Sequence, residues 1–368
     1  MLVEEFPAYL VRQGLGQAEQ FVDGPCYLLD VSRRNRVVKV VVPGGGGLLV
    51  RQPMNPDNPT SSAGLAVEAA LLGAMVPQGA LAPLAPYVPR LVHHDATASV
   101  VVTELMHPAT TLGKFHLNHG QIHFPPEAGE GPGRILAAIR VAGEDAARAG
   151  ALPGLANAPP GPWAFLEGLA GSAGALPPAW SELRDLLRAR PSVLETLPEL
   201  RHRWASRADL VHGDIRWDNL LVGAGEGPEG GLNLLLIDWE MAGRGDAAWD
   251  VACFLGEYAR FWLAMAEAFG IEDLASARRR APFALPTSAP AVQAFWRTYR
   301  HRIARPDEGL LSRAADYLPL VLAVIATEPL VGAAELPGLS VAAAELAAEA
   351  AEDPRGWLGD HLGLEVTR

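Results

Sequence analysis

The chain has 368 residues, of which 49% are apolar and 20% are charged, and its formal net charge is −12. This length is enough for a sizeable core and for two lobes. The acidic charge balance argues against nucleic acid as the main partner, because phosphate backbones are bound by basic surfaces. The two cysteines are too few for a disulfide framework or a thiolate metal site.

The first hundred residues are expected to form a small antiparallel sheet with one helix. The stretch MLVEEFPAYLVRQG carries two early acidic residues and no long apolar core, so we expect no signal peptide and a cytoplasmic protein. Residues 19–53 are predicted to form strands, at 25–31, 37–43 and 48–53, and a hairpin-like pair follows at 89–95 and 99–105. A helix is predicted from about Ser61 or Ser62. GGGG at 44–47 lacks the Lys-Ser/Thr of a P-loop and predicts a turn.

Beyond about residue 107 the pattern is that of helices separated by Pro/Gly-rich loops. Helices are predicted at 133–150, 179–189 and 247–270, the last with Asp246 as its N-cap and Gly270 as its stop. The most apolar run, YLPLVLAVIA at 317–326, is about half the length of a membrane span and predicts a buried helix, so no membrane partner is expected. The sequence thus predicts an α+β protein with a small sheet lobe over 1–106 and a larger helical lobe over 107–368.

One predicted hairpin, embedded in the helical part, carries the densest group of polar residues. The segment LVHGDIRWDNLLV (210–222) leads into NLLV, and after a Gly-rich turn the chain returns as LNLLLIDW (232–239). Antiparallel pairing around residue 228 brings Asn219 approximately opposite Asp238. Amide and carboxylate oxygens suit Mg²⁺, and the nearby Asp214 is free to accept a proton from a hydroxyl group. His-x-Asp, then Asn, then β-turn-β to a second Asp is the arrangement of kinase-like phosphoryl transfer.

The motifs HGDIRWDN and IDWE resemble the aminoglycoside phosphotransferase and choline kinase family. The resemblance spans most of the chain and implies a bilobal protein-kinase-like fold, with ATP bound at the N-terminal lobe and Mg²⁺ as the metal. It implies that Asp214 is the catalytic base, that Asn219 and Asp238 are the metal ligands, and that His212 braces the catalytic loop. At the connection between the lobes it implies that Glu104 and Met106 bind nucleotide.

The same resemblance assigns Glu68 as the helix glutamate that orients a basic residue bound to the nucleotide phosphates. We expect Arg51 to be that partner, because 17 residues separate it from Glu68, whereas the alternative Lys39 would leave 29 residues to span. Arginine is a partial departure from the lysine that the family often carries, but its fork geometry also suits phosphate oxygens.

Three further residues near the catalytic loop receive roles from the resemblance. Arg216, two residues after Asp214, is placed where a fixed cation would stabilise charge on the transferred phosphate. Asp246 would cap its helix, and Asp250 would hold the backbone of the catalytic loop.

Other classes of function remain open at this stage. His116, His119 and His123 have metal-like spacing, so a zinc site or a polar wall of the substrate cleft are alternatives to a solvated loop. A hydrolase built on these histidines or on Ser172 is a second functional class, although Ser172 lacks the flanking pattern of a nucleophile elbow. An inactive ATP-binding scaffold is the third.

The acceptor is a hydroxyl-bearing molecule that the motifs do not identify. Finer resemblance is to a subgroup encoded with ribosomal peptide (RiPP) pathways that make class V lanthipeptides and thioamitides, which implies phosphorylation of Ser or Thr in a precursor peptide before a partner lyase eliminates the phosphate. An aminoglycoside or another small molecule is the alternative. The stretches PPEAGEGPG and LANAPPGPWAF are expected to form surface loops around a cleft, with apolar anchors among Phe115, Phe124, Trp163 and Phe165.

Overall fold

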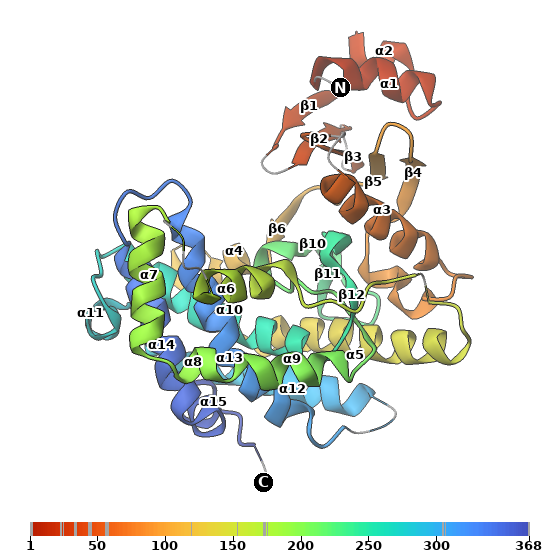
Figure 1. Ribbon diagram of the computed structural model, residues 1–368. Coiled ribbons are helices and arrows are strands. Elements are labelled where there is room, and N and C mark those ends of the chain that lie inside the picture. Colours follow the sequence, from red (N-terminus) through yellow and green to blue (C-terminus); the bar gives the residue numbers. More distant parts are fainter. Residues whose placement is uncertain are drawn as a thin grey trace.

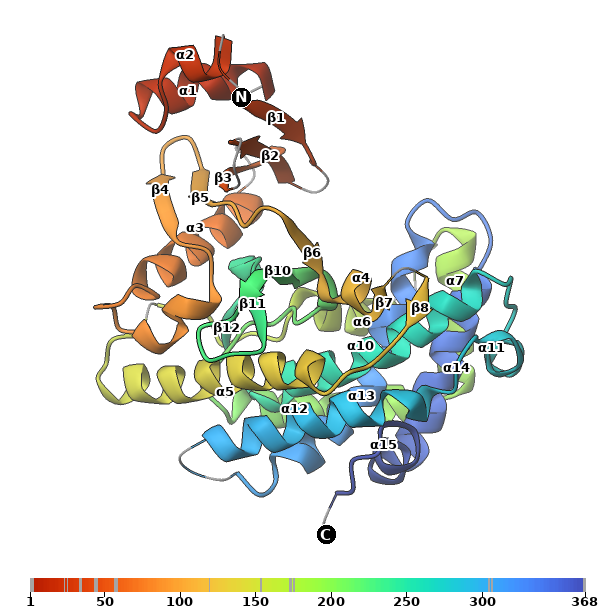
Figure 2. The same cartoon turned by 180° about the vertical axis from the view of Figure 1, so that it is seen from behind.

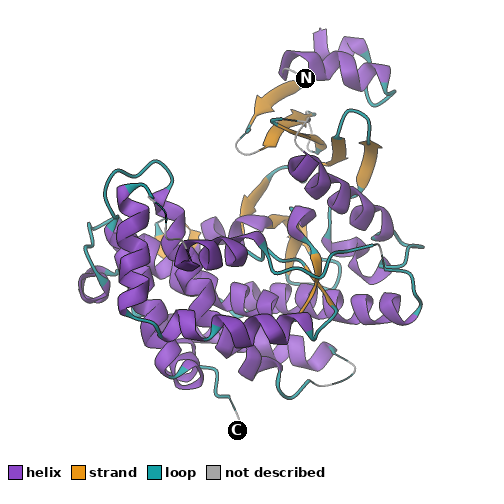
Figure 3. Ribbon diagram, viewed as in Figure 1, coloured by secondary structure: helices purple, strands orange, loops and turns teal. Residues whose placement is uncertain are grey.

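The computed structural model describes residues 3–366, except 23, 25, 33–34, 43–45, 56–58, 119, 153, 172–173, 175, 304 and 306. Strands gather at the N-terminal end and helices make up most of the remainder, as Figure 3 shows. The predicted α+β class with a small antiparallel sheet is confirmed. The predicted division at 106/107 falls between strands β5 and β6 and stays a prediction.

The N-terminal sheet has five antiparallel strands in the order β1-β2-β3-β5-β4. Its strands are β1 (Tyr27–Asp30), β2 (Asn35–Val41), β3 (Gly47–Pro53), β4 (Leu91–Asp95) and β5 (Val100–Glu104). Alternate residues of a strand face opposite sides of a sheet. On β5, Val100 and Val102 accordingly pack with the N-terminal helices, whereas Val101 packs on Leu65 of the following helix.

Helices cover both faces of this sheet, as Figure 1 shows at the top of the molecule. They are η1 (Val3–Glu5), α1 (Phe6–Arg12), α2 (Ala18–Val22) and α3 (Pro59–Ala74), and η2 (Ala82–Tyr87), which follows α3, packs into the large core of the helical part instead. Two differ from the sequence prediction: α1 was not predicted, and residues 18–22 form a helix where strand was expected. For α1 the reason is burial, since Phe6, Tyr9 and Leu10 complete the core with Val38 and Val50.

Three small β-units follow. A three-stranded sheet contains β6 (Ala109–Thr111), β10 (Leu220–Glu226) and β11 (Leu232–Leu236), and two-stranded pairs are formed by β9 (Asp209–Val211) with β12 (Gly243–Gly245) and by β7 (Leu117–Asn118) with β8 (Gln121–Ile122). The predicted embedded hairpin is β10–β11. Leu220 pairs with Leu236 and Val222 with Leu234.

The rest of the chain is helical and surrounds one large core (Figures 1 and 2). The first helices are α4 (Leu112–His116), α5 (Glu127–Arg148), α6 (Gly161–Gly171), α7 (Pro178–Ala189), α8 (Ser192–Glu195) and α9 (Leu197–Ala205). After the hairpin come η3 (Trp217–Asn219, before β10), η4 (Trp239–Met241), α10 (Ala248–Glu267), α11 (Leu274–Arg280), η5 (Leu285–Ser288), α12 (Ala289–Arg302), α13 (Leu310–Thr327), η6 (Glu328–Leu330), α14 (Gly338–Glu352) and α15 (Pro354–Leu362).

Helix α5 corrects the predicted surface loop at PPEAGEGPG. The helix begins at Glu127, six residues before the predicted start, and runs through Pro132. Its glycines permit a close approach to α12, because a Cβ atom added at Gly129 would lie 1.8 Å from the carbonyl oxygen of Ala291. A sequence that is a poor helix former in isolation is therefore held helical by packing.

The apolar run at 317–326 lies within α13, and this helix is longer than the apolar run. By length and composition, Leu310–Leu330 is the one helix among the described residues that could cross a membrane, and 78% of its apolar window is buried inside the molecule.

Candidate active site

The segment between β9 and β10, which contains Asp214, is held in place by one buried carboxylate. Asp250, in the first turn of α10, accepts hydrogen bonds from the backbone amides of His212 at 2.7 Å and Gly213 at 3.0 Å. Burial raises the pKa of Asp250 to about 7, although the two amides act in the opposite direction. Gly213 has φ of +83°, and a Cβ atom there would lie 2.5 Å from the carbonyl oxygen of Met241, so glycine is required. The expected backbone-holding role of Asp250 is confirmed.

His212 connects the loop to the second strand of the hairpin. Its Nδ1 atom accepts from the amide of Asp214 at 3.3 Å, and its Nε2 atom lies 3.1 Å from the carbonyl oxygen of Ile237. These two contacts fit a neutral ring protonated at Nε2. Burial lowers the pKa of His212, which keeps the ring neutral. The histidine thus joins the residue before Asp238 to the backbone of Asp214.

Asn219 lies beside Asp214 at the open end of the hairpin. Its Nδ2 atom donates to the backbone oxygen of Asp214 at 2.9 Å and to Oδ2 of the same residue at 3.2 Å. Ile237 donates its amide to the carbonyl of Asn219 at 2.9 Å, so Asn219 lies across from Ile237, one residue from the expected Asp238. Asp238 is the next residue after Ile237, and its backbone angles are left-handed (φ 69°, ψ 59°).

A buried ion pair joins the small sheet to this segment. Arg51 on β3 pairs with Glu68 of α3, which is fully buried, and its Nη1 atom lies 3.1 Å from Oδ1 of Asp238. The pKa of Arg51 is raised, because the carboxylates of Glu68 and Asp238 outweigh the opposing effect of burial. The predicted choice of Arg51 over Lys39 as the partner of Glu68 is therefore confirmed.

A second contact crosses between the same two parts of the molecule. The side-chain amide of Asn35, at the start of β2, donates to Oε2 of Glu240 at 2.8 Å. Burial, together with the neighbouring Asp238, raises the pKa of Glu240. No pattern in the sequence predicts this contact, because the two residues are 205 positions apart.

Arg216 lies in a network of charged side chains that was not predicted from the sequence. Its Nη2 atom is 3.4 Å from Oε2 of Glu328, which also pairs with Arg260. Arg260 in turn pairs with Glu257, whose Oε2 atom accepts from the amide of Trp217 at 2.8 Å. The expected contact of Arg216 with a transferred phosphate stays a prediction, and so does its contribution to catalysis.

The two predicted nucleotide-binding residues at the connection differ in their surroundings. Glu104 is exposed, and its carboxylate pairs with Arg90 at 2.5 Å. Met106 is half-buried against β10, where a Cβ atom added at Gly223 would lie 2.8 Å from its sulfur. Met106 is thus at the boundary between the sheet and the hairpin, and nucleotide contact at either residue stays a prediction.

One structural role differs in detail from its prediction. Asp246 precedes α10 by two residues and accepts a hydrogen bond from the amide of Ala248 at 3.0 Å, but it also pairs with Arg313 at 2.9 Å.

The predicted apolar anchors differ in exposure. Trp163 is fully buried in the core, so it is not a surface anchor, and Phe165 is 46% exposed.

The histidine alternative receives no support from the described residues. No group of three or more His, Cys, Asp or Glu that could hold a metal ion occurs in the part of the chain that the structure describes. His116 is buried, and its Nδ1 atom is 2.8 Å from the carbonyl oxygen of His123. Its ring packs on Trp217, with ring centroids 4.4 Å apart. His119 and Ser172 lie outside the described residues.

Comparisons with known proteins place these features in a family. The model of the APH family, described as the phosphotransferase enzyme family, matches residues 28–283. No curated protein matched the sequence. An amicoumacin kinase, solved in complex with AMP-PNP, Ca²⁺ and Ami, is 14% identical and has a TM-score of 0.55, with 96% of each chain covered. This likeness concerns the fold, and it agrees with the expected kinase-like architecture.

Two further solved structures are similar over most of the chain. A macrolide 2'-phosphotransferase from Brachybacterium faecium is 19% identical, with a TM-score of 0.45 and with 96% of this chain and 99% of that chain covered. An ethanolamine kinase from Plasmodium vivax is 14% identical, with a TM-score of 0.49 and with 87% and 79% covered.

Proposed function

Because the chain belongs to the phosphotransferase enzyme family, we propose that it transfers the terminal phosphate of ATP to a hydroxyl group, in a reaction that needs Mg²⁺. The observation that carries the proposal is the catalytic-loop carboxylate of Asp214. It is partly exposed, and the Nδ2 atom of Asn219 holds one of its oxygens at 3.2 Å. A positioned carboxylate of this kind can accept the proton of an attacking hydroxyl.

The underside of the five-stranded sheet supports nucleotide binding. Leu29 pairs with Lys39 and Val37 with Arg51, so these side chains share one face of the sheet with Tyr27. Tyr27 and Leu29 are 47% and 44% exposed on that face, where a flat base would cover them. Residues 1–106 are accordingly proposed as the nucleotide-binding lobe, with Arg51 and Glu68 at its phosphate end and with Glu104 and Met106 at the connection.

Asn219 and Asp238 suit a magnesium ion. One is an amide and the other a carboxylate, and they flank the Ile237–His212 contact at the end of the hairpin. Asp238 is 34% exposed on its side chain, which pairs with the guanidinium of Arg51. The ion, when bound, would neutralise the charge of the phosphate groups.

Two residues would act directly at the reacting groups. Asn219 holds Oδ2 of Asp214, and we assign the other oxygen, Oδ1, to the acceptor hydroxyl, whose proton Asp214 would take. Arg216 would supply a fixed positive charge on the far side of the loop. Glu328 orients its guanidinium at 3.4 Å, and its Nε atom is buried without a hydrogen-bond partner in the described part of the chain.

For the acceptor we propose Ser or Thr of a ribosomal precursor peptide, as a step before elimination by a separate lyase. The charges beside the catalytic loop support a neutral acceptor over a polycation such as an aminoglycoside. Glu328 and Glu257 reach the loop from η6 and α10, and arginines neutralise both. Carboxylates paired in this way are poor partners for the ammonium groups of a ligand.

The test offers the purified chain ATP and Mg²⁺ with Ser/Thr-containing precursor peptides encoded near its gene and, separately, with a panel of aminoglycosides. Mass spectrometry is expected to show one added phosphate per modified Ser or Thr, and none with Asp214→Asn. Efficient phosphorylation of an aminoglycoside with unmodified peptides would replace the proposed acceptor by the small molecule. Nucleotide binding without transfer to either class would instead indicate an inactive scaffold.

A further inference from the structure

Four charged side chains form a closed circuit around two adjacent residues of the segment between β9 and β10. The Nη2 atom of Arg216 lies 3.4 Å from Oε2 of Glu328, and Arg260 pairs with the same carboxylate. Arg260 also pairs with Glu257, whose Oε2 atom accepts a hydrogen bond from the amide of Trp217 at 2.8 Å. The circuit therefore leaves the segment at the side chain of Arg216 and returns to it at the next residue.

The two ends of this circuit differ in how firmly they are held. The side chain of Trp217 is buried, and its ring packs at right angles to that of Tyr258, with centroids 4.8 Å apart. Its partner Glu257 is 6% exposed on the side chain, whereas Arg216 is 31% exposed. An arginine has much rotamer freedom to lose when it is held in one place. The guanidinium of Arg216 is thus the end whose orientation depends on its partner.

Arg260 pairs with both carboxylates of the circuit. Burial opposes its positive charge, but the carboxylates of Glu257 and Glu328 outweigh that effect and raise the pKa of Arg260. The circuit as a whole has two positive and two negative groups. Without Arg260, one arginine would face two carboxylates, and Glu328 would lose the contact that joins it to α10. Arg216 would then be paired with a carboxylate that is no longer fixed.

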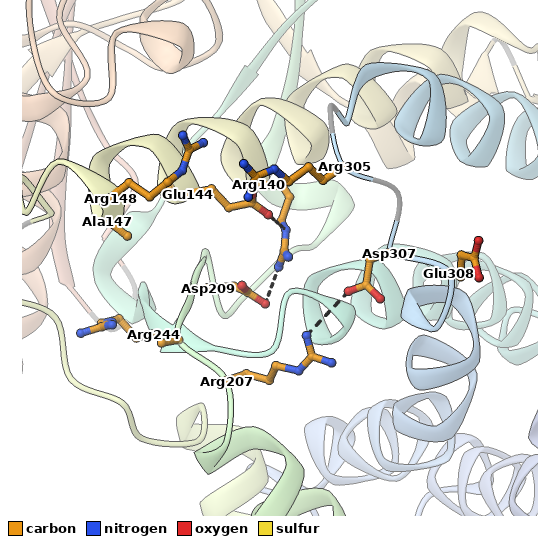
Figure 4. A pocket seen from close by; sticks show the side chains of 12 residues that line it. Arg140, Glu144, Ala147, Arg148, Arg207, Asp209, Arg244, Arg305, Asp307 and Glu308 are labelled. Carbon is orange, nitrogen blue, oxygen red and sulfur yellow. Dashed lines mark ion pairs between the residues drawn. The ribbon is translucent and has the colours of Figure 1, made fainter.

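Another bridging arginine shows what is particular to Arg260. Arg140 of α5 pairs with Glu144 of its own helix and with Asp209 of β9, as the dashed lines of Figure 4 show. Among the described residues, these two carboxylates do not contact the segment between β9 and β10, and that of Asp209 accepts from the amide of Ala247 instead. Both carboxylates paired with Arg260 do contact the segment, at adjacent residues.

We propose that Arg260 is a positioning residue for Arg216. It fixes Glu328, which orients the guanidinium of Arg216. Through Glu257 it also holds the backbone at Trp217. The inference rests on the proposed phosphate transfer, in which Arg216 stabilises charge on the transferred group. A cation that is already oriented toward the developing charge needs no reorganisation during the reaction, so its orientation affects the rate.

The experiment compares a ground-state analogue with a transition-state analogue, so it needs no acceptor. The full chain is titrated with AMP-PNP and, separately, with ADP plus aluminium fluoride, both in the presence of Mg²⁺. Aluminium fluoride beside ADP imitates the phosphoryl group during transfer. Loss of a positive charge directed at that group is expected to lower the affinity for the second probe more than the affinity for the first.

Arg216→Gln is expected to weaken binding of the transition-state analogue by about 10²-fold relative to AMP-PNP, the typical cost of removing one donor to developing charge. Arg260→Gln is expected to weaken it by about tenfold, because the guanidinium of Arg216 remains but is misplaced. In the double variant, Arg260→Gln is expected to add no further loss, since it acts through Arg216. Purely structural effects of the two replacements would add.

Glu328→Gln provides the same test in a variant that is expected to fold. The Glu328 side chain is 34% exposed, and its replacement leaves Glu257 paired with Arg260, so no buried carboxylate loses its cation. The contact between Arg260 and Arg216 is nevertheless interrupted. We expect the same selective loss of about tenfold for the transition-state analogue.

Arg203→Gln is the matched control. Arg203 also bridges two carboxylates, Glu199 at 2.8 Å and Asp316 at 2.7 Å, and its side chain is 21% exposed, against 20% for Arg260. Its replacement is expected to lower the melting temperature by a similar amount and to leave the ratio of the two affinities unchanged.

The proposal is overturned if Arg260→Gln and Glu328→Gln leave that ratio unchanged while Arg216→Gln lowers it, or if the losses add in the double variant. In either case the proposed phosphate transfer stands, and Arg260 only stabilises the fold. An unchanged ratio in Arg216→Gln would overturn both the role of Arg216 and its positioning by Arg260. Failure of the unaltered chain to bind either nucleotide probe would overturn the proposed function itself.

Discussion

The Nη1 atom of Arg51 lies 3.1 Å from Oδ1 of Asp238, so a strand of the small sheet is ion-paired with a residue just beyond the end of the β10–β11 hairpin. The same guanidinium pairs with Glu68. Arg51 therefore connects α3, β3 and the proposed metal-binding residue, and its loss is expected to affect more than one property of the enzyme.

Arg51 and Lys39 are cationic residues on the same face of the small sheet, and their replacement is expected to have different effects. Arg51→Ala leaves Glu68 buried without its partner, a change that typically costs about 3–5 kcal/mol of stability. Arg51→Lys keeps the charge and is expected to fold, but with an ATP affinity at least about tenfold lower, because the fork is lost. Lys39→Ala, on the same face, is the control and is expected to bind ATP almost normally. A larger loss in the Lys39 variant would transfer the phosphate contact to Lys39.

Replacement of Asp214 is expected to reduce phosphate transfer while ATP binding persists. Asp214→Asn is close to isosteric, so we expect ATP binding to persist while kcat falls by a factor of about 10² or more. Equilibrium binding of a fluorescent nucleotide and steady-state turnover measure the two effects independently. Near-normal turnover would remove Asp214 from the role of base.

The proposed metal ligands, Asn219 and Asp238, can be compared with an adjacent residue that is not expected to bind the ion. Asn219→Ala and Asp238→Asn are each expected to raise the Mg²⁺ concentration needed for half-maximal activity, because the first removes an oxygen ligand and the second removes a negative charge beside the ion. Asp218→Asn changes the adjacent, exposed position and serves as the control. Electron paramagnetic resonance of bound Mn²⁺ with AMP-PNP gives a second measurement. An unchanged spectrum in both ligand variants would place the metal elsewhere.

His116 gives a prediction about pH. Burial lowers its pKa from the ordinary 6.5 to about 4, so between these values the unfolded chain binds the proton more readily than the folded chain. The stability that depends on neutral His116 is therefore present above pH 6.5 and is lost as the pH falls toward 4. Urea unfolding at several pH values should show this decline. His116→Gln, which does not titrate, should show a shallower one, and equal slopes would contradict the assignment.

Two glycines in helices should respond in opposite ways. Gly129→Ala places a Cβ atom 1.8 Å from the carbonyl oxygen of Ala291 and is expected to destabilise the protein by about 1–3 kcal/mol. Gly168→Ala in α6 meets no atom within 4 Å and is expected to stabilise it by about 0.5–1 kcal/mol, since alanine is the better helix former. Thermal unfolding of both variants measures the contrast. Similar shifts would show that the α5–α12 contact adapts.

The features predicted from sequence are those that depend on local spacing. Apolar runs joined by Gly-rich turns located the strands and the β10–β11 hairpin, and the chain length between Arg51 and Glu68 was enough to select that pair. Helix α5 was predicted to begin too late, because Gly and Pro argue against a helix when the packing on α12 is unknown. The contacts of Arg216 with Glu328 and of Asn35 with Glu240 join distant positions, and no single-sequence pattern encodes such pairings.

The contacts of Asn35 with Glu240 and of Arg51 with Asp238 also have a kinetic consequence. Both attach β2 or β3 to residues that are two positions apart in the same short segment. The sheet cannot move away from that segment while either contact holds, so separation requires both contacts to be broken. Where release of a bound molecule needs the sheet to separate from that segment, these contacts would govern how long the molecule stays more than how tightly it is held.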